Sequence, residues 1–182
     1  LDIIVGFSNY EAGYNITDYA IKKKYKKILF VTSSTNHMKT EVRGRKRLEG
    51  YIDRMLKKNY KHNNFQISDP LDYKKSGEEI YTYYKKNKKK IDCIITFNEM
   101  TGLGFLSTAI RNNVKVPKEL GIASIGSADV SNLLDFKITT INTNQHEMGR
   151  VAASKLIDRI NKIKFDKRIF DVGISIVKGI SL

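Results

Sequence analysis

The sequence has a single cysteine, Cys93, only two prolines and no tryptophan among its 182 residues. A lone cysteine excludes an internal disulfide and favours a reducing compartment, so we expect a cytoplasmic protein. No run of about eighteen apolar residues is present, which predicts that no helix crosses a membrane. The first residues, LDIIVGFSNYEAG, lack the order of a signal peptide and read as a strand without a preceding connection, so we expect a fragment of a longer protein.

Sequence motifs of common enzymes are also missing. The chain has no P-loop, no CxxC and no GxSxG, and its three histidines are scattered without metal-ligand spacing: His37, His62 and His146. The glycines of GLG at 102–104 fall inside a predicted helix, which argues against a dinucleotide site. We therefore expect no enzymatic activity, no cofactor and no metal, and a dinucleotide-dependent enzyme is the least favoured alternative.

Positive charge is abundant, with 33 Lys and Arg against 19 Asp and Glu and a formal net charge of +14. Such a balance raises the possibility of a nucleic-acid partner. However, the two densest runs, KKKYKK at 22–27 and KKNKKK at 85–90, each end a predicted helix, where cations complement the helix dipole. We interpret these runs as solvated helix ends that need no partner.

Short apolar runs rich in Ile, Val and Phe alternate with segments of helical period, which is typical of βαβ units in a parallel sheet. Strands are predicted near 2–6, 27–32, 64–68, 92–97 and 120–126, and helices near 11–24, 45–59, 76–89 and 101–113. Beyond residue 126 the pattern predicts an extended ITTINT, a helix over 145–163 and a final β-ribbon, RIFDVGISIVKGIS.

Four segments resemble, in order and spacing, the effector-binding core of the LacI family of bacterial transcription repressors: VGFSNYEAG, RLEGY, ITFNEMTGLGFLSTAIRNNVKVPKELGIASIG and ITTINTNQHEMGRVAASKLIDRI. The ending FDVGISIVKGIS is most similar to the gluconate-operon repressors of that family. The resemblance implies an α/β, periplasmic-binding-protein-like fold with parallel sheets and helices on both faces. It further implies two subdomains, between which the chain crosses three times.

The resemblance also implies how the chain divides. Residues 25–143 and 165–182 would form a complete C-terminal subdomain, and residues 1–24 and 144–164 would form part of an N-terminal subdomain. The family's DNA-binding headpiece, hinge helix and first βα units have no counterpart in the sequence. Operator DNA would therefore be bound only through a headpiece outside this chain.

Ligands of open α/β sheets bind beyond the carboxyl ends of the strands, where polar residues collect in this sequence. Carried over from the family, Arg47 before LxGY would hydrogen-bond the effector, because its planar fork suits vicinal hydroxyls or a carboxylate. It lies in a basic cluster at a predicted helix start, where the dipole disfavours cations. Asn98 would bind ligand or cap the next helix, or do both, and Glu99 takes the place of the family's aspartate.

The remaining candidates match the family pattern less closely. Asp129 replaces the aspartate that follows the fifth strand, in a loop about two residues short. Tyr73 is one position away from the aromatic residue that covers the ligand, and Ser8 stands where many members have aspartate. Together with Arg47, Asn98 and Glu99, these residues are the predicted ligand-binding set.

The resemblance implies an effector-binding and dimerisation domain of a LacI-type regulator, with a sugar or sugar acid as effector and a homodimer as the assembly. The alternative is a periplasmic-type sugar-binding protein of a transport system, which has the same fold. From the sequence alone, we expect replacement of Arg47 by alanine to weaken effector binding without changing thermal stability.

Overall fold

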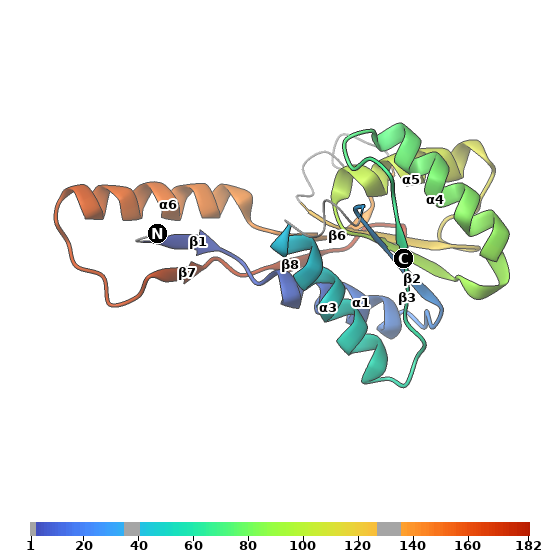
Figure 1. The fold of residues 1–182 in the computed structure, drawn as a ribbon, viewed down its shortest axis with the longest axis horizontal. Coiled ribbons are helices and arrows are strands. Elements are labelled where there is room, and N and C mark those ends of the chain that lie inside the picture. The colour runs from blue at the N-terminus through green and yellow to red at the C-terminus, as the bar shows by residue number, and fades with distance from the viewer. Residues whose placement is uncertain (1–2, 35–40, 127–135) are drawn as a thin grey trace.

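The computed structural model describes residues 3–34, 41–126 and 136–182, which form two lobes of unequal size (Figure 1). The larger lobe contains a six-stranded sheet in the order β3-β2-β4-β5-β6-β8. The smaller lobe contains the two-stranded sheet β1-β7 and one helix. The predicted α/β architecture, with mainly parallel strands, is confirmed.

The large sheet is parallel from β3 through β6, and only β8 is antiparallel to its neighbour. All five residues of β2 and of β5 are buried, as expected for central parallel strands covered on both faces, whereas β3 at the edge is mostly exposed. The strands are β2 (Ile28–Thr32), β3 (Asn63–Gln66), β4 (Cys93–Thr96), β5 (Gly121–Ile125), β6 (Thr139–Asn142) and β8 (Ser175–Val177).

Two pairs of helices sandwich this sheet. Helices α1 (Asn9–Lys22) and α3 (Val42–Leu56) pack together on one face, and α4 (Tyr73–Asn87) and α5 (Glu99–Arg111) pack together on the other (Figure 1). A short 3-10 turn, η1 (Lys88–Lys90), continues α4 toward β4. Both faces of the sheet are therefore covered, and its carboxyl edge is available for a ligand.

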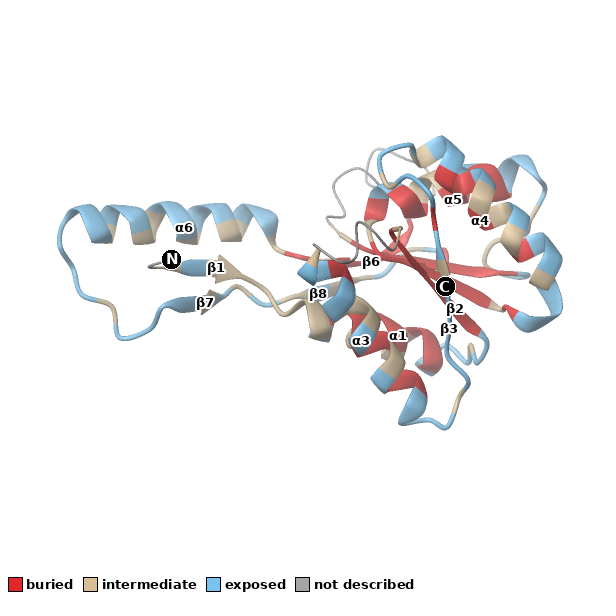
Figure 2. Ribbon diagram, in the orientation of Figure 1, coloured by how far each residue is buried: buried red, intermediate tan, exposed pale blue. Residues whose placement is uncertain are grey.

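The smaller lobe is only partly covered. It consists of β1 (Ile4–Gly6), β7 (Ile169–Asp171) and α6 (Gln145–Ile160), and no residue of α6 is buried (Figure 2). Apolar side chains on α6 remain more than half exposed, namely Leu156, Ile157 and Ile160. A contiguous apolar surface of this kind normally packs against another element.

The segments that join the lobes are hydrogen-bonded to one another. The Val172 amide donates to the Gly6 carbonyl at 2.8 Å. Asn144 Nδ2 donates to the carbonyls of Val172 at 3.1 Å and Gly173 at 3.3 Å. Asn144 adopts a left-handed conformation (φ 48°), which asparagine tolerates better than most residues. These contacts tie the three connections together where the lobes meet.

Replacing Asn144 by alanine is therefore expected to destabilise the protein by about 1–3 kcal/mol, because two side-chain hydrogen bonds are lost and alanine disfavours this backbone conformation. Asn144→Gly should lose less, since glycine adopts a positive φ freely. Thermal unfolding of the two variants separates the effects. Equal midpoints for both variants and the unmodified protein would show that Asn144 does not stabilise this junction.

The ends of several elements differ from the sequence-based expectation. Helix α3 begins at Val42, about one turn earlier than predicted. The final extended stretch is not a ribbon, because β7 pairs with β1 whereas β8 pairs with β6. Alternating hydrophobicity identifies a strand but does not specify its partner.

The contacts also favour a different division from the one predicted. Helix α1 packs against α3 in the larger lobe, although residues 1–24 were assigned to the smaller one. Strand β7 pairs with β1 in the smaller lobe, although residues 165–182 were assigned to the larger one. We propose that the chain crosses between lobes near residues 7, 143 and 173.

Candidate ligand-binding cleft

A cleft of about 570 Å³ opens at the carboxyl ends of the strands, where the two lobes meet. Its walls come from β5 and the residue after it, from the first turns of α3, α4 and α5, and from the first turn of α6. This is the location at which open α/β sheets bind small molecules, and the size suits a small polar ligand.

Arg47 is the cation at the centre of this site. Its Nε donates to Asn9 Oδ1 at 2.8 Å, its Nη1 donates to the Phe97 carbonyl at 2.5 Å, and its guanidinium lies 5.8 Å from the ring centroid of Phe7. The pKa of Arg47 is lowered to about 10, chiefly by burial; the charge of Glu41 opposes this shift and that of Arg43 adds to it. Arg47 thus remains charged at neutral pH in a partly desolvated position.

The hydrogen-bond acceptors of Arg47 are neutral. Among the residues that the structure describes, no carboxylate lies within ion-pair distance of its guanidinium, and Nη2 has no hydrogen bond. Partial burial of a cation is costly unless an anion compensates it, and an anion in the cleft would offset that cost.

The start of α3 explains how the basic cluster is tolerated near a helix N-terminus. Glu41 caps the helix by accepting from the Gly44 amide at 3.2 Å, and its other oxygen accepts from Arg43 Nε at 2.9 Å. Lys46 pairs with Glu49 at 2.6 Å. The negative charge of Glu41 therefore compensates both the positive N-terminal end of the α3 dipole and the guanidinium of Arg43. Arg47, one turn further along α3, extends toward the cleft.

Asn98 and Glu99 lie side by side at the start of α5, and both line the cleft. Asn98 Oδ1 accepts from the Thr101 amide at 2.7 Å, so Asn98 caps α5 as predicted. Its Nδ2 forms no hydrogen bond with a described residue. Glu99 is only 6% exposed. Gly126 sits against it, since a Cβ added at Gly126 would lie 2.8 Å from the Cβ of Glu99.

The other predicted site residues have different surroundings. Tyr73, the first residue of α4, lines the cleft. Ser8 caps α1, where its Oγ accepts from the Glu11 amide at 3.2 Å, and it is not among the cleft-lining residues. Asp129 lies outside the described residues.

Several cleft residues were not predicted. Phe7, Thr143, Gln145 and Met148 belong to the connections between the lobes or to the turn of α6 that follows one of them, and Arg43 and Met100 lie on the first turns of α3 and α5. The segment NTNQHEMG carried the signal for Thr143, Gln145 and Met148, because it follows a strand directly. Phe7 could have been predicted as a cleft residue only if the place where the chain first passes between the lobes had been known.

Among residues 3–34, 41–126 and 136–182, no group of three or more His, Cys, Asp or Glu side chains is arranged to hold a metal ion. No described helix is long and apolar enough to cross a membrane.

Two unequal lobes, three connections and a cleft between them define a ligand-binding domain of the periplasmic-binding-protein class. The chain belongs to the periplasmic binding protein-like domain family, which matches residues 17–182. The resemblance to the effector-binding core of LacI-type regulators is confirmed by relatives of that type.

One relative is the HTH-type transcriptional regulator GntR of Escherichia coli (strain K12), 23% identical over 182 residues, which cover 100% of this chain and 53% of the regulator. Another is the NTD biosynthesis operon regulator NtdR of Bacillus subtilis (strain 168). It is 26% identical over 158 residues, which cover 87% of this chain and 47% of the regulator. The chain spans about half the length of the curated relatives it matches.

Solved structures show the same fold. A LacI family transcriptional regulator from Silicibacter pomeroyi superimposes with a TM-score of 0.88 at 22% identity, covering 99% of this chain and 54% of that chain. A periplasmic binding protein/LacI transcriptional regulator from Alkaliphilus metalliredigens QYMF, complexed with D-xylulofuranose, gives 0.84 at 20% identity, covering 98% and 65%.

Proposed function

We propose that this chain is the effector-binding and dimerisation core of a LacI-type DNA-binding transcription regulator. Its effector would be a sugar or sugar acid held in the cleft by Arg47, Asn98, Glu99 and Tyr73. The protein would act in the cytoplasm without a cofactor, would have no catalytic activity, and would contact operator DNA through a headpiece outside the chain.

The observation that carries the choice of ligand is the charge state of the cleft. Arg47 is half-buried, positively charged and bonded only to neutral acceptors within the described part of the chain. A charge-assisted hydrogen bond to a carboxylate is worth roughly 1.5–3 kcal/mol. Arg43 and Glu99 also line the cleft, and Arg43 is paired with Glu41, so the preference for a sugar acid over a neutral sugar rests on Arg47.

Ligand binding would act through the lobe junction. A ligand that contacts α3 and α5 in one lobe and α6 in the other stabilises the closed arrangement of the lobes. The hydrogen-bonded connections around Asn144 would act as the hinge. In a dimer, closure would shift the relative position of the two headpieces and change how they fit an operator, which is coupling between two binding sites.

The alternative is a periplasmic-type sugar-binding protein of a transport system. The Alkaliphilus protein is itself described as complexed with D-xylulofuranose, a neutral sugar. The relatives named above are regulators, which favours transcriptional control over transport. A helix-turn-helix encoded upstream of this sequence would support the regulator, and a signal peptide there would support the transport protein.

Titration calorimetry of the protein against gluconate and against neutral hexoses tests the ligand assignment. We expect gluconate to bind at least about tenfold more tightly, because only the acid supplies a counter-ion for Arg47. Sedimentation of the full-length protein at micromolar concentration should give a homodimer. A preference for neutral hexoses would disprove the anionic effector, and a monomeric protein would disprove the proposed assembly.

A further inference from the structure

The amino ends of the parallel strands form a face that is almost entirely basic. Helices α1, α3, α4 and α5 run antiparallel to the strands, so each of them ends at this edge of the sheet. Each end carries a group of exposed cations, and together they hold about half of the 33 Lys and Arg residues: Lys22, Lys23, Lys24, Lys26, Lys27; Lys57, Lys58, Lys61; Lys85, Lys86, Lys88, Lys89, Lys90; Arg111, Lys115 and Lys118.

Complementing helix dipoles does not require this many charges. A helix C-terminus carries about half a negative charge, so four helix ends amount to roughly −2. Of the nearby carboxylates, Glu119 pairs with Lys88 at 2.6 Å, Asp18 pairs with Lys22 at 2.7 Å, and Asp92 accepts from the backbone amides of Lys26 and Lys27. These groups neutralise only a small part of the positive charge. The excess opposes folding by self-repulsion, which a polyanion would relieve.

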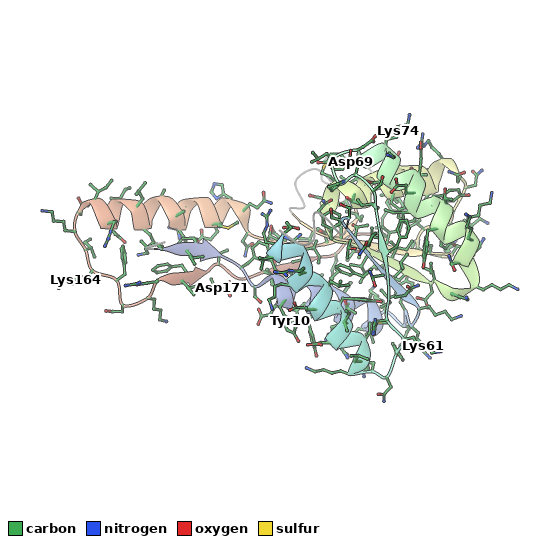
Figure 3. The ribbon with its side chains drawn as sticks, viewed as in Figure 1. Tyr10, Lys61, Asp69, Lys74, Lys164 and Asp171 are labelled. Atoms are coloured by element: carbon green, nitrogen blue, oxygen red, sulfur yellow. The ribbon has the colours of Figure 1, made fainter. Side chains whose placement is uncertain are left out.

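The four basic groups follow one another along the edge of the sheet, because the strands that they precede are neighbours in the order β3-β2-β4-β5. Lys27 Nζ donates to the Lys89 carbonyl at 3.0 Å, which joins the group after α1 to the group after α4. The segment from Lys85 to Lys90 encloses a hollow of about 670 Å³. Figure 3 labels Lys61, which marks the part of the face that follows α3, on the side of the larger lobe away from α6. The face is therefore separate from the ligand cleft at the opposite edge of the sheet.

We propose that this basic face binds the phosphate backbone of duplex DNA without sequence preference. Bases are commonly recognised by the planar guanidinium of arginine, whereas lysine is a flexible point charge that suits phosphate groups. Arg111 is the only arginine in this set of cations, so the face lacks the side chains that would read a base sequence. The aromatic residues beside the face, Tyr25 and Tyr60, are partly buried against the core and do not form an exposed platform for stacking single strands. A broad positive surface with neither base-reading arginines nor a stacking platform suits duplex DNA, whose phosphates carry one negative charge per about 1.7 Å of helix axis.

The test is fluorescence anisotropy of the 182-residue chain with a labelled duplex of random sequence, titrated between about 50 and 200 mM salt. The variant Lys85→Gln, Lys86→Gln, Lys89→Gln, Lys90→Gln removes four charges from the face and retains the Lys88–Glu119 ion pair. The control variant Lys162→Gln, Lys164→Gln, Lys167→Gln, Arg168→Gln removes four exposed charges from the smaller lobe and has the same net charge. Circular dichroism confirms that each variant is folded.

We expect the unmodified chain to bind with a steep salt dependence. The face variant should lose at least about tenfold in affinity at 50 mM salt, and its slope of log K against log salt should fall by about 2 or more, since each lysine on a phosphate contributes roughly one unit. The control should change the slope by less than about one unit. Equal losses in both variants, or no binding by the unmodified chain, would overturn the proposal. So would a preference for anionic vesicles over DNA.

Discussion

Replacing Arg47 by alanine is expected to weaken effector binding at least about tenfold and also to lower the thermal midpoint. The first effect follows from loss of the charged group that faces the cleft, worth roughly 1.5–3 kcal/mol to an anionic ligand. The second follows from contacts that the sequence did not reveal. Arg47 joins Asn9 of α1 to the Phe97 carbonyl at the end of β4, and its removal leaves both acceptors without this donor.

The stability loss should be about 1–3 kcal/mol, which for a chain of this length is a midpoint shift of roughly 2–10 °C. It should be smaller than the two bonds alone suggest, because the variant no longer has to desolvate a half-buried cation. This revises the sequence-based expectation that thermal stability would not change. Calorimetric titration with gluconate and thermal unfolding measure the two effects separately.

Two variants serve as controls for Arg47→Ala. Arg45 is on the same helix, is exposed and does not line the cleft, so Arg45→Ala should leave both measurements nearly unchanged. Arg47→Lys keeps the charge but lacks the planar fork, so it should recover only part of the affinity. If Arg47→Ala binds gluconate as tightly as the unmodified protein, Arg47 is a structural residue and the ligand site must be assigned elsewhere.

The sequence predicted the strands and helices of the larger lobe closely because their physical signals are local. Continuous apolar runs identified β2, β4 and β5, and cations at the ends of α1 and α4 marked where those helices stop. The position of Asn98 between a strand and a helix predicted a cap for α5, and the family resemblance implied a ligand-binding role; it caps α5 and lines the cleft. These features depend on neighbours within a few residues.

Features set by distant partners could not be predicted in this way. The partner of β7 is β1, more than 160 residues earlier in the chain, and nothing in the local pattern of either strand specifies that pairing. The anchoring of Arg47 by Asn9 and the Phe97 carbonyl depends on how α1 packs against α3. The cleft residues of the lobe junction, such as Phe7 and Gln145, likewise become visible only when the crossings are known.

The packing of α1 against α3 depends on two glycines that bring the helices unusually close. A Cβ added at Gly13 would lie 1.9 Å from the carbonyl oxygen of Arg47, and one added at Gly50 would lie 2.1 Å from that of Tyr10. The α4 and α5 pair uses the same arrangement, because a Cβ at Gly104 would lie 2.2 Å from the carbonyl oxygen of Tyr73. Gly13 thus contacts the backbone of Arg47, and Gly104 contacts the backbone of Tyr73; both contacted residues line the cleft.

Gly13→Ala is therefore expected to be among the most damaging single-methyl changes in the chain. Ordinary contacts of a Cβ are 3.4–4 Å, so the helices must separate by more than about 1 Å, which costs at least about 1–3 kcal/mol. This outweighs the gain of up to about 1 kcal/mol from the higher helix propensity of alanine. Because the displaced backbone is that of Arg47, affinity for gluconate should fall together with the thermal midpoint.

Gly149 provides the matched control, since it also lies inside a helix, α6, but a Cβ there would meet nothing within 4 Å. Gly149→Ala should raise stability by about 0.5–1 kcal/mol through helix propensity alone and leave affinity unchanged. Thermal unfolding should thus give opposite signs for the same substitution on two helices. A Gly13→Ala protein as stable as Gly149→Ala would mean that α1 and α3 can separate without loss, and that their close approach does not hold Arg47 in the cleft.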